Sequence, residues 1–392
     1  MDDVIVVGMG PAGAIVATDL ARAGCSVLGL EGQAHPRYKV CGGALSARID
    51  RLLEPGYHAV VEGTIHTVRF QFAGTDAFEI TAHDPIAYMV MRDRFDAYLA
   101  QKAQEAGVVI RENEQVAMLR EHADHVEVET SEGRYRAKVV VGADGANSLV
   151  ARTLFPERRG RVVGALEGEV LLHGATSGLD TGAIVLDLGV VAGGYGWVFP
   201  KEGRLSIGIG GFQGRHRNPR AAYQGFVKTE PTLDGLAVPD GLGHPIPLYA
   251  GKETERLPLT TSRSLLVGDA AHLVDPMLGE GIYYAIISGH MAAACMMERL
   301  RGLTPDLRAY DARVAGELYP EFCAAARLAW AVYTFPELAH GALRRRPNSM
   351  HLYADVLKGH RTYQGLLAAM GDRLQGFITR AVRGNAAQIF SS

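Results

Sequence analysis

The segment VIVVGMGPAGAIVATDLARAGCSVLGLE, residues 4–31, has the order strand, glycine-rich turn, helix and strand. An apolar, β-branched run such as its first four residues is typical of a parallel strand buried on both faces. In the turn, Gly8 permits a sharp bend, Gly10 lets backbone N–H groups approach a pyrophosphate, and Gly13 allows the helix to pack closely on the strand. Ala12 lies in the same turn and belongs to the predicted site. The segment therefore predicts a βαβ unit that binds a dinucleotide.

An acidic residue closes this unit. Glu31 stands 18 positions after Gly13, where a carboxylate accepts hydrogen bonds from a ribose 2′-hydroxyl. A carboxylate in this place favours an adenosine ribose without a 2′-phosphate, so we expect FAD or NAD rather than NADP.

The whole chain has an ordinary globular composition. Its 392 residues are 47% apolar and 21% charged, and the formal net charge is −3. At about 100–200 residues per domain, this length predicts two or three domains. The composition excludes a collagen-like, disordered or disulfide-stapled chain. Because a nucleic-acid partner requires a strong positive field, the near-neutral charge leads us to expect no nucleic acid.

Cysteine usage and apolar runs indicate the compartment. The four cysteines, Cys25, Cys41, Cys295 and Cys323, are widely separated and form no CxxC pair. We therefore expect neither a disulfide framework nor a metal site. The first apolar run ends at Gly8 with no basic segment before it, and the later apolar runs are short for a bilayer span of about 20 residues. We expect a cytoplasmic protein.

Two later segments repeat the pattern of a strand that runs into a polar, glycine-rich turn. They are AKVVVGADGANSLVAR (137–152) and SLLVGDAAHLVDPMLGEGIYYAIISGHMAA (264–293). In this order after a βαβ unit, they resemble the DG and GD motifs of FAD-dependent proteins with the fold of the aromatic hydroxylases. The segment MRDRFDAYL (91–99) is similar to the RxxFD segment of the same group. The resemblance favours FAD over NAD.

This resemblance also implies roles for individual residues. Asp269 is implied to hold the ribityl chain or the pyrophosphate. Gly279 and Gly281 are implied to bring a helix N-terminus to the flavin ring, where reduced flavin carries negative charge. Arg92 is implied to face the cofactor, with a solvated surface arginine as the alternative. Asp144 either belongs to the cofactor site or only forms its turn.

Because the FAD motifs lie far apart, we expect a discontinuous cofactor domain. Between them, segments such as 67–72, 183–189 and 204–212 alternate or are β-rich, and beyond Thr304 the pattern is helical. The expected fold class is α/β, with a Rossmann-type FAD-binding domain interleaved with a mostly antiparallel β-sheet substrate domain, plus C-terminal helices. The expected boundaries are 1–55, 92–155 and 258–300 for the FAD-binding domain, 56–91 and 156–257 for the substrate-binding domain, and 301–392 for the helical region.

Three further segments narrow the chemistry. GGYGWVFP (193–200), KVCGGALS (39–46) and VLKGHRTYQGLL (356–367) resemble segments of the geranylgeranyl reductase family of FAD-dependent oxidoreductases. The resemblance runs over nearly the whole chain. It implies the reductive saturation of isolated C=C bonds in a prenyl chain, carried by a lipid, a quinone or a chlorophyll-type substrate.

The family resemblance also implies where the substrate lies. Tyr195, Trp197 and Phe199 would line its cavity, and Cys41 would lie close to the isoalloxazine together with Gly42 and Gly43. Hydride addition to an alkene requires a proton for the other carbon. The candidate donors are the Cys41 thiol, the Tyr195 phenol and water, and a thiol is the better acid, with a reference pKa near 8.5 against about 10 for a phenol.

The expected partners follow from this reading. They are a prenyl lipid and a reductant, either NAD(P)H or a small electron-transfer protein, because no second glycine fingerprint provides a domain for a nicotinamide cofactor. A lipid substrate also suggests peripheral attachment to a membrane. The basic run 344–346 is either a contact with anionic headgroups or a solvated surface.

Two other functions stay open from the sequence. An FAD-dependent monooxygenase or halogenase acting on an aromatic substrate shares the fold and the flavin motifs. A carrier that binds flavin or prenyl lipid without turnover belongs to another class of protein.

Overall fold

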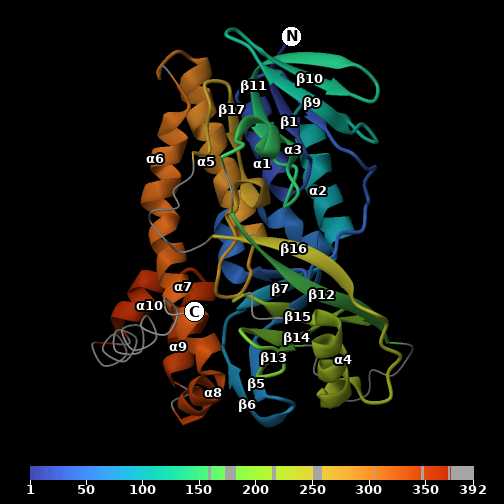
Figure 1. Ribbon diagram of the computed structural model, residues 1–392, viewed down its shortest axis with the longest axis vertical. Coiled ribbons are helices and arrows are strands. Elements are labelled where there is room, and N and C mark those ends of the chain that lie inside the picture. Colours follow the sequence, from blue (N-terminus) through green and yellow to red (C-terminus); the bar gives the residue numbers. More distant parts are fainter. Residues whose placement is uncertain are drawn as a thin grey trace.

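The computed structural model describes residues 1–157, 160–172, 182–213, 218–249, 258–304, 306–345, 348–369 and 371. Two large sheets and a small one form its frame, and helices flank them (Figure 1). The first sheet lies at the end that carries the N-terminus, and the second lies at the opposite end. This arrangement confirms the predicted α/β fold class.

The first sheet has the strand order β8-β2-β1-β11-β10-β9, with β17 beside β11. Its central strands β8, β2, β1, β11 and β17 run parallel, whereas β10 is antiparallel to both of its neighbours. Three distant parts of the chain therefore build one sheet. The bounds are β1 Asp2–Val7, β2 Val27–Leu30, β8 Val109–Arg111, β9 Val116–Glu121, β10 Val126–Thr130, β11 Arg134–Gly142 and β17 Ser264–Leu266.

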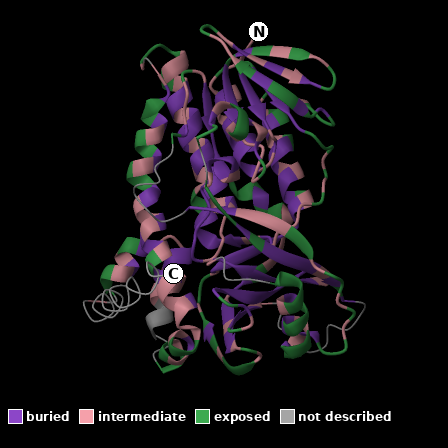
Figure 2. Ribbon diagram, in the orientation of Figure 1, coloured by how far each residue is buried: buried purple, intermediate pink, exposed green. Residues whose placement is uncertain are grey.

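The helix α1 (Pro11–Arg22) follows the glycine turn and packs against α5 (Ile282–Leu300). Proline at the first helical position suits the start of α1, because its missing N–H would have no partner there. Val4 to Val7 and most of α1 are buried (Figure 2). The continuous apolar run of β1 thus belongs to a strand that is covered on both faces, as predicted.

The second sheet has the order β16-β12-β15-β14-β13-β5-β6. Every pair is antiparallel except β13 with β5, which confirms a mostly antiparallel sheet. Helix α4 (Pro219–Thr229) covers one face at β12 and β15. The bounds are β5 Thr67–Phe72, β6 Thr75–Thr81, β12 Arg161–Leu171, β13 Ala183–Leu188, β14 Gly194–Lys201, β15 Arg204–Gly211 and β16 Leu242–Leu248.

A small third sheet, β3-β7-β4, contacts the second sheet through β7 and β4, which both meet β14. Helix α2 (Arg92–Glu105) starts directly after β7 and packs on α1. The bounds are β3 Ala44–Ser46, β4 Val61–Ile65 and β7 Ala87–Val90, with 3-10 helices at Ala47–Arg51 and Pro55–Val60.

The C-terminal part is helical as far as it is described, as expected. Helix α6 packs along α5, and α7 continues towards the second sheet, where α8 contacts β5 and β13 (Figure 1). The bounds are α6 Arg308–Glu317, α7 Tyr319–Thr334, α8 Pro336–Arg345, α9 Asn348–Leu357 and α10 Tyr363–Ala369.

Of the basic run 344–346, Arg346 lies outside the described residues, and Arg344 pairs with Asp76. Among the helices that the structure describes, none has the length and apolar character that a membrane span needs. The domain boundaries stay a prediction.

Candidate active site

A cavity of about 890 Å³ is lined by residues of all three sheets. It brings together nearly all of the sequence-predicted site residues: Gly8, Gly10, Ala12, Glu31, Cys41, Gly42, Gly43, Arg92, Asp144, Tyr195, Trp197, Phe199, Asp269, Gly279 and Gly281. Gly13 is not part of the lining. A Cβ on Gly13 would lie 1.9 Å from the carbonyl oxygen of Gly8, so this glycine serves the close packing of α1 on β1.

The glycine turn forms an open cradle at one end of the cavity. Gly8 has φ +92°, and a Cβ there would lie 2.5 Å from the carbonyl oxygen of Ala143, so only glycine fits. A Cβ on Gly10 would instead point to free space, with the Arg37 guanidinium 3.5 Å away as the nearest atom. The first N–H groups of α1 start at Gly10, and such N–H groups together with the helix dipole stabilise a pyrophosphate.

Glu31 follows the end of β2 and lies beside the glycine turn. Its Oε2 accepts hydrogen bonds from the backbone N–H of Met9 at 2.9 Å and from Arg37 at 3.2 Å. These bonds hold the carboxylate at the carboxyl edge of the first sheet, where the ribose of a dinucleotide lies in this type of fold.

A buried network of charged side chains lies next to the glycine turn. The carboxylate of Asp96 accepts hydrogen bonds from Arg92 at 2.8 and 2.9 Å and from Arg37 at 3.0 Å. Burial alone would raise the pKa of Asp96, but the charges of Arg92 and Arg37 hold this pKa below its ordinary value. Arg92 lines the cavity and is buried, so it is not a solvated surface residue. That it faces the cofactor stays a prediction.

The loop that contains Cys41 lies directly against β14. A Cβ on Gly42 would lie 3.0 Å from the Phe199 ring and 3.3 Å from Nε1 of Trp197. Gly43 has φ +69°, and its N–H lies 3.4 Å from the Cys41 sulfur. The absence of a side chain at Gly42 thus lets the loop approach the aromatic residues closely, and its absence at Gly43 lets the loop approach the Val90 carbonyl of β7.

Tyr195, Trp197 and Phe199 alternate along β14 and lie on one face of the second sheet. The ring centroids of Tyr195 and Trp197 are 5.9 Å apart, and those of Trp197 and Phe199 are 6.0 Å apart. The Tyr195 hydroxyl donates a hydrogen bond of 2.7 Å to the carbonyl of Leu278. Burial, with smaller contributions from nearby acidic groups, raises the pKa of Tyr195 above its ordinary value, so this phenol holds its proton.

Beyond these aromatic residues the cavity continues as an apolar arm. Its lining crosses the second sheet from β14 over β13 and β5 to β6, which is three strand spacings or roughly 14 Å. The apolar residues of this arm are Val68, Phe70, Ile80, Ile86, Ile184, Leu186 and Leu357.

The strand-to-helix turn before α5 is held by buried polar contacts. Asp275 accepts hydrogen bonds of 2.6 Å from the Met277 N–H and from the Tyr363 hydroxyl. Burial raises the pKa of Asp275 to about 6. Glu280, between the two predicted glycines, lines the cavity and pairs with the buried Arg48 at 2.5 Å. These contacts fix the backbone of the turn that borders the cavity.

Two predicted acids have different surroundings. Asp144 accepts hydrogen bonds from the Ser148 hydroxyl and from the N–H groups of Leu149 and Val150, so it forms the turn before α3 (Leu149–Leu154) while it also lines the cavity. Asp269 lies 3.8 Å from the ammonium of Lys39. Both residues remain predicted cofactor ligands.

The cavity lining contains polar atoms that suit a polar cofactor. In the described part of the chain, Nε2 of His244 and Nε1 of Trp197 are buried without a hydrogen-bond partner. Burial, with the charge of Lys39, lowers the pKa of His244 to about 4, so this imidazole is neutral. Together with the glycine cradle, these atoms fit a large dinucleotide cofactor.

Some residues in and around the cavity could not be predicted from the sequence. Glu167 on β12 faces the cavity next to the aromatic residues, and Arg37 bridges Glu31 and Asp96. The only signal for Asp96 was its place in the RxxFD segment, and Glu280 had a signal in its position between two predicted glycines.

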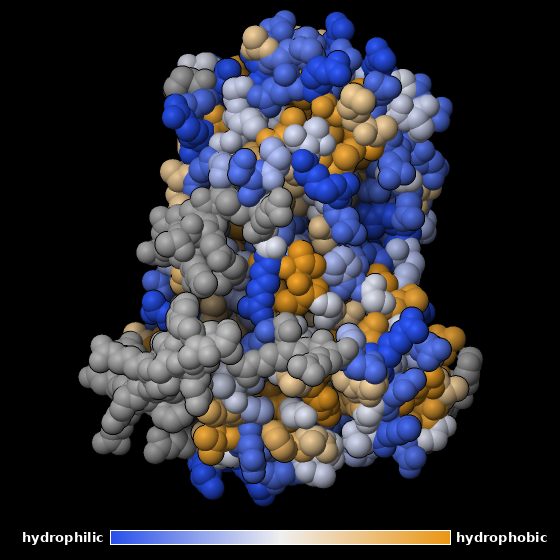
Figure 3. All heavy atoms as spheres, in the orientation of Figure 1, coloured by the Kyte–Doolittle hydropathy of each residue, from blue (hydrophilic) through white to orange (hydrophobic). Residues whose placement is uncertain are grey.

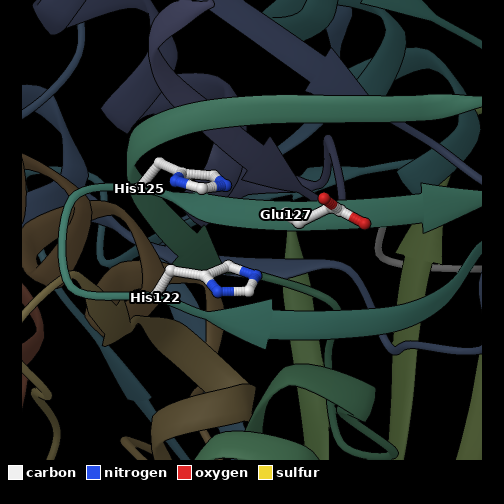
Figure 4. Close-up of side chains that lie close together, drawn as sticks. All are labelled: His122, His125 and Glu127. Atoms are coloured by element: carbon white, nitrogen blue, oxygen red, sulfur yellow. The ribbon is translucent and has the colours of Figure 1, made fainter.

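A cluster of possible metal ligands lies elsewhere, at the turn between β9 and β10 (Figure 4). Ligand atoms of His122, His125 and Glu127 lie within 4.8 Å of one another. The two imidazole rings are stacked, with 4.6 Å between their centroids and 15° between their planes, so their in-plane lone pairs do not converge. Glu127 pairs with Arg136 at 3.1 Å. This geometry is not that of a ligand set, and the absence of a metal site stays a prediction.

Fold and site together define a flavin-dependent oxidoreductase. A family model described as an FAD binding domain matches residues 1–171, and the cofactor is FAD. The digeranylgeranylglycerophospholipid reductase 1 of Methanopyrus kandleri is 32% identical over 315 residues, which cover 76% of this chain and 81% of the relative. The geranylgeranyl diphosphate reductase of Rhodobacter capsulatus is 30% identical over 319 residues, 77% of each chain. The chain belongs to the geranylgeranyl reductase family.

Solved structures confirm the fold. A geranylgeranyl bacteriochlorophyll reductase-like protein from Thermoplasma acidophilum has a TM-score of 0.73 at 24% identity and covers 84% of this chain and 87% of its own. A flavin-dependent brominase has a TM-score of 0.71 at 19% identity and covers 91% and 93%. The same fold therefore occurs in reductases and in halogenases, and the choice between these activities depends on the site.

Proposed function

We propose that this enzyme saturates isolated C=C bonds of a geranylgeranyl-type prenyl chain. The observation that carries the proposal is the continuity of the cavity, which leads from the glycine cradle past Cys41 and the aromatic residues into the apolar arm. The relatives named for geranylgeranyl substrates support the same choice. The reacting part of the substrate is thus a long, uncharged alkene chain.

The apolar arm suits such a chain on energetic grounds. Burying a methylene group is worth about 0.8 kcal/mol, so one five-carbon unit contributes up to roughly 3–4 kcal/mol. An isolated alkene has no carbonyl group to polarise. Positioning and the exclusion of water by Trp197, Phe199 and the arm must therefore supply much of the rate enhancement.

Bound FAD, once reduced, supplies the hydride. The chain itself must supply a proton at the second alkene carbon, and we propose the Cys41 thiol as this donor. Cys41 lies beside Arg92, which interacts with its sulfur, whereas the Tyr195 proton is engaged by the Leu278 carbonyl. Gly8, Gly10, Ala12, Glu31 and Asp269 are the proposed cofactor ligands at the other end of the cavity.

An anaerobic single-turnover experiment tests the function. The flavin-loaded enzyme is reduced with dithionite and mixed with a geranylgeranyl compound in the absence of oxygen. We expect flavin reoxidation and a product that gains two hydrogens for each double bond reduced. A monooxygenase or halogenase would react only with oxygen, and a carrier would leave the flavin reduced, so either result contradicts the proposal.

The natural reductant is proposed to reach the flavin through the cavity mouth, since the FAD-type βαβ unit at residues 4–31 is the one dinucleotide fingerprint of the sequence. Rapid mixing of the oxidised enzyme with NADPH, NADH or a reduced ferredoxin distinguishes the two kinds of donor. Flavin bleaching by a nicotinamide at a rate that matches turnover supports NAD(P)H.

Peripheral membrane contact is proposed through apolar side chains rather than through the basic run. Val162 on β12 and Leu242 on β16 are more than half exposed, and apolar residues gather level with β16 on the face that Figure 3 displays. Arg344 is engaged by Asp76. Co-sedimentation with neutral vesicles tests this contact, and a requirement for anionic lipid would point to the basic run.

A further inference from the structure

Three strands of the second sheet place a polar cluster next to the aromatic residues. In the sheet register, Glu167 on β12 lies opposite Gly208 on β15, and Gly208 lies opposite Trp197 on β14. A Cβ on Gly208 would be 2.2 Å from Cζ2 of Trp197. The indole therefore lies across β15, towards Glu167, because Gly208 has no side chain. Glu167 is 2% exposed and lines the cavity.

The cluster contains two carboxyl groups and one cation. Glu167 and Glu169 lie two residues apart on β12, so their side chains share one face of the sheet. The ammonium of Lys201 lies 3.0 Å from Oε1 of Glu169, and the Ser206 hydroxyl donates a 2.7 Å hydrogen bond to Glu167. Oε2 of Glu169 is buried with no hydrogen-bond partner in the described ranges.

Such a pair holds a proton. Two carboxylates that share a buried site cannot both ionise at low cost, and Lys201 neutralises only one of them. Burial raises the pKa of Glu167 to about 7; Lys201 and Ser206 oppose this shift and Glu169 adds to it. Near neutral pH the pair therefore exchanges a proton readily.

Tyr38 connects this cluster to the loop that carries Cys41. Tyr38, Cys41 and Glu167 line the same cavity. Burial, with smaller contributions from the charges of Glu167 and Glu169, raises the pKa of Tyr38 to about 12. On the other side of β12, Tyr223 of α4 also senses the charge of Glu167. Lys201, Ser206 and Tyr38 are thus the described groups that act on the carboxyl pair from its own side of β12, and Tyr223 lies behind the strand.

We propose that Glu167 and Glu169 share a proton that restores the Cys41 thiol after each reduction, through Tyr38 or through water in the cavity. This inference rests on the proposed function. In a turnover the alkene π bond breaks, one carbon takes the hydride that reduced FAD supplies, and the other takes the thiol proton. The thiolate then takes the proton of the carboxyl pair, which regains one from solvent. Glu167 is on this account a proton-supplying residue that acts through Cys41.

The test separates the first turnover from later ones. Glu167→Gln keeps the shape and accepts the Ser206 hydrogen bond but cannot release a proton. We expect its first turnover, measured as flavin reoxidation by a geranylgeranyl compound, to stay within twofold of the wild type. Its steady-state rate should fall at least tenfold, and the decline of the wild-type rate above about pH 7 should disappear. Glu202→Gln, in the exposed turn after β14, is the matched control and should behave like the wild type.

A second readout does not depend on activity. Infrared difference spectra between low and high pH are recorded on the oxidised, flavin-loaded enzyme. They should contain the band of a protonated carboxyl group that titrates near pH 7, and Glu167→Gln should remove this band. Absence of this band, or a Glu167→Gln variant that turns over like Glu202→Gln, overturns the inference. A wild-type enzyme that fails to reduce the prenyl probe overturns the proposed function instead, and the infrared band then decides separately whether the proton is shared.

Discussion

Cys41 illustrates how neighbours define the chemistry of a residue. Its sulfur lies 3.4 Å from the Gly43 N–H and beside the Arg92 side chain, which Asp96 holds in place. A cysteine that only filled space would have apolar neighbours, since free cysteine usually behaves as a small hydrophobe. Cys41 has apolar neighbours in the core beside the first sheet and, in addition, these polar ones, which favour a chemical role.

We predict that Cys41→Ser reduces the rate of flavin reoxidation by a prenyl alkene by about 100-fold or more, because general acid catalysis contributes about 10²–10⁴ and a hydroxyl is a far weaker acid than a thiol. Flavin content and dithionite reduction should not change. Cys25→Ser is the control, because Cys25 lies in the turn between α1 and β2 and does not line the cavity. A Cys41→Ser variant with wild-type reoxidation would assign the proton to water.

Asp275 gives a prediction for stability against pH. Its pKa is raised to about 6 from an ordinary 3.8, so the folded protein binds this proton more tightly than the unfolded chain. The resulting stability is fully present below pH 3.8 and is lost as the pH rises through about 6. By linkage, the free energy of unfolding falls by about 3 kcal/mol over this pH range.

Denaturant unfolding of the flavin-loaded protein measures this effect. We expect Asp275→Asn to unfold at higher denaturant concentration than the wild type at pH 8, with the difference shrinking towards pH 4. Asn has one acceptor oxygen, so it keeps the hydrogen bond of either Tyr363 or Met277 and loses the other at every pH; the change of the difference with pH is therefore the readout. An equal difference at both pH values would show that the carboxyl group is not the cause.

At the scale of elements, the strand β15 controls the position of an aromatic side chain on its neighbour. Gly208 leaves room for the Trp197 indole, and a Cβ there would also lie 2.5 Å from the Leu166 carbonyl oxygen. The strand thus shapes the cavity by lacking a side chain at one position.

We predict that Gly208→Ala displaces the indole and weakens substrate binding by at least tenfold. The chain has two tryptophans, so a Trp330→Phe background leaves Trp197 as the reporter, and its fluorescence should shift to the red as the ring becomes more exposed. Gly164→Ala on β12, where a Cβ meets no atom within 4 Å, is the control. An unchanged spectrum in Gly208→Ala would contradict the proposed packing.

The sequence predicted β1, β2, β11 and β17 of the first sheet and β5, β13 and β15 of the second, but not β8, β9, β10 or β16. It also left open which face of a strand such as β12 is buried. The segment around Glu167 alternates acids with apolar residues, a pattern that also fits a strand with one solvated face. In the structure Leu166 and Val170 pack in a cluster with Tyr223 and Phe226 of α4, and the acids face the cavity. Because both faces are covered, periodicity alone could not reveal that these acids are buried.

The candidate site was predicted as far as its residues lie in motifs. Gly8, Glu31 and Cys41 each belong to a motif with a known mechanical or chemical use, and all three line the cavity. Arg37 and Lys201 belong to no motif, and their partners lie 59 and 32 positions away, at Asp96 and Glu169. Such contacts depend on how distant loops, helices and strands come together, which local patterns do not specify.

For the whole molecule, the cavity between the sheets predicts how affinity depends on chain length. Each added five-carbon unit should lower the dissociation constant at least tenfold until the apolar arm is full, since part of the roughly 3–4 kcal/mol per unit is spent on ordering the chain. Titration of flavin absorbance with geranyl, farnesyl and geranylgeranyl compounds measures this. Ala87→Trp, which blocks the arm, should abolish the dependence on length, and an enzyme without length dependence would bind its substrate elsewhere.

The order of strands in the first sheet has a consequence for biosynthesis. β1 leaves the ribosome early, but its neighbour β11 lacks its outer partner until β17, at Ser264–Leu266, has been made. At about 5–20 residues per second, the roughly 120 residues between β11 and β17 take roughly 6–24 s to translate. During that interval the nascent chain exposes an unfinished apolar sheet edge, which makes it a natural client for chaperones, and FAD capture must wait until most of the polypeptide has emerged.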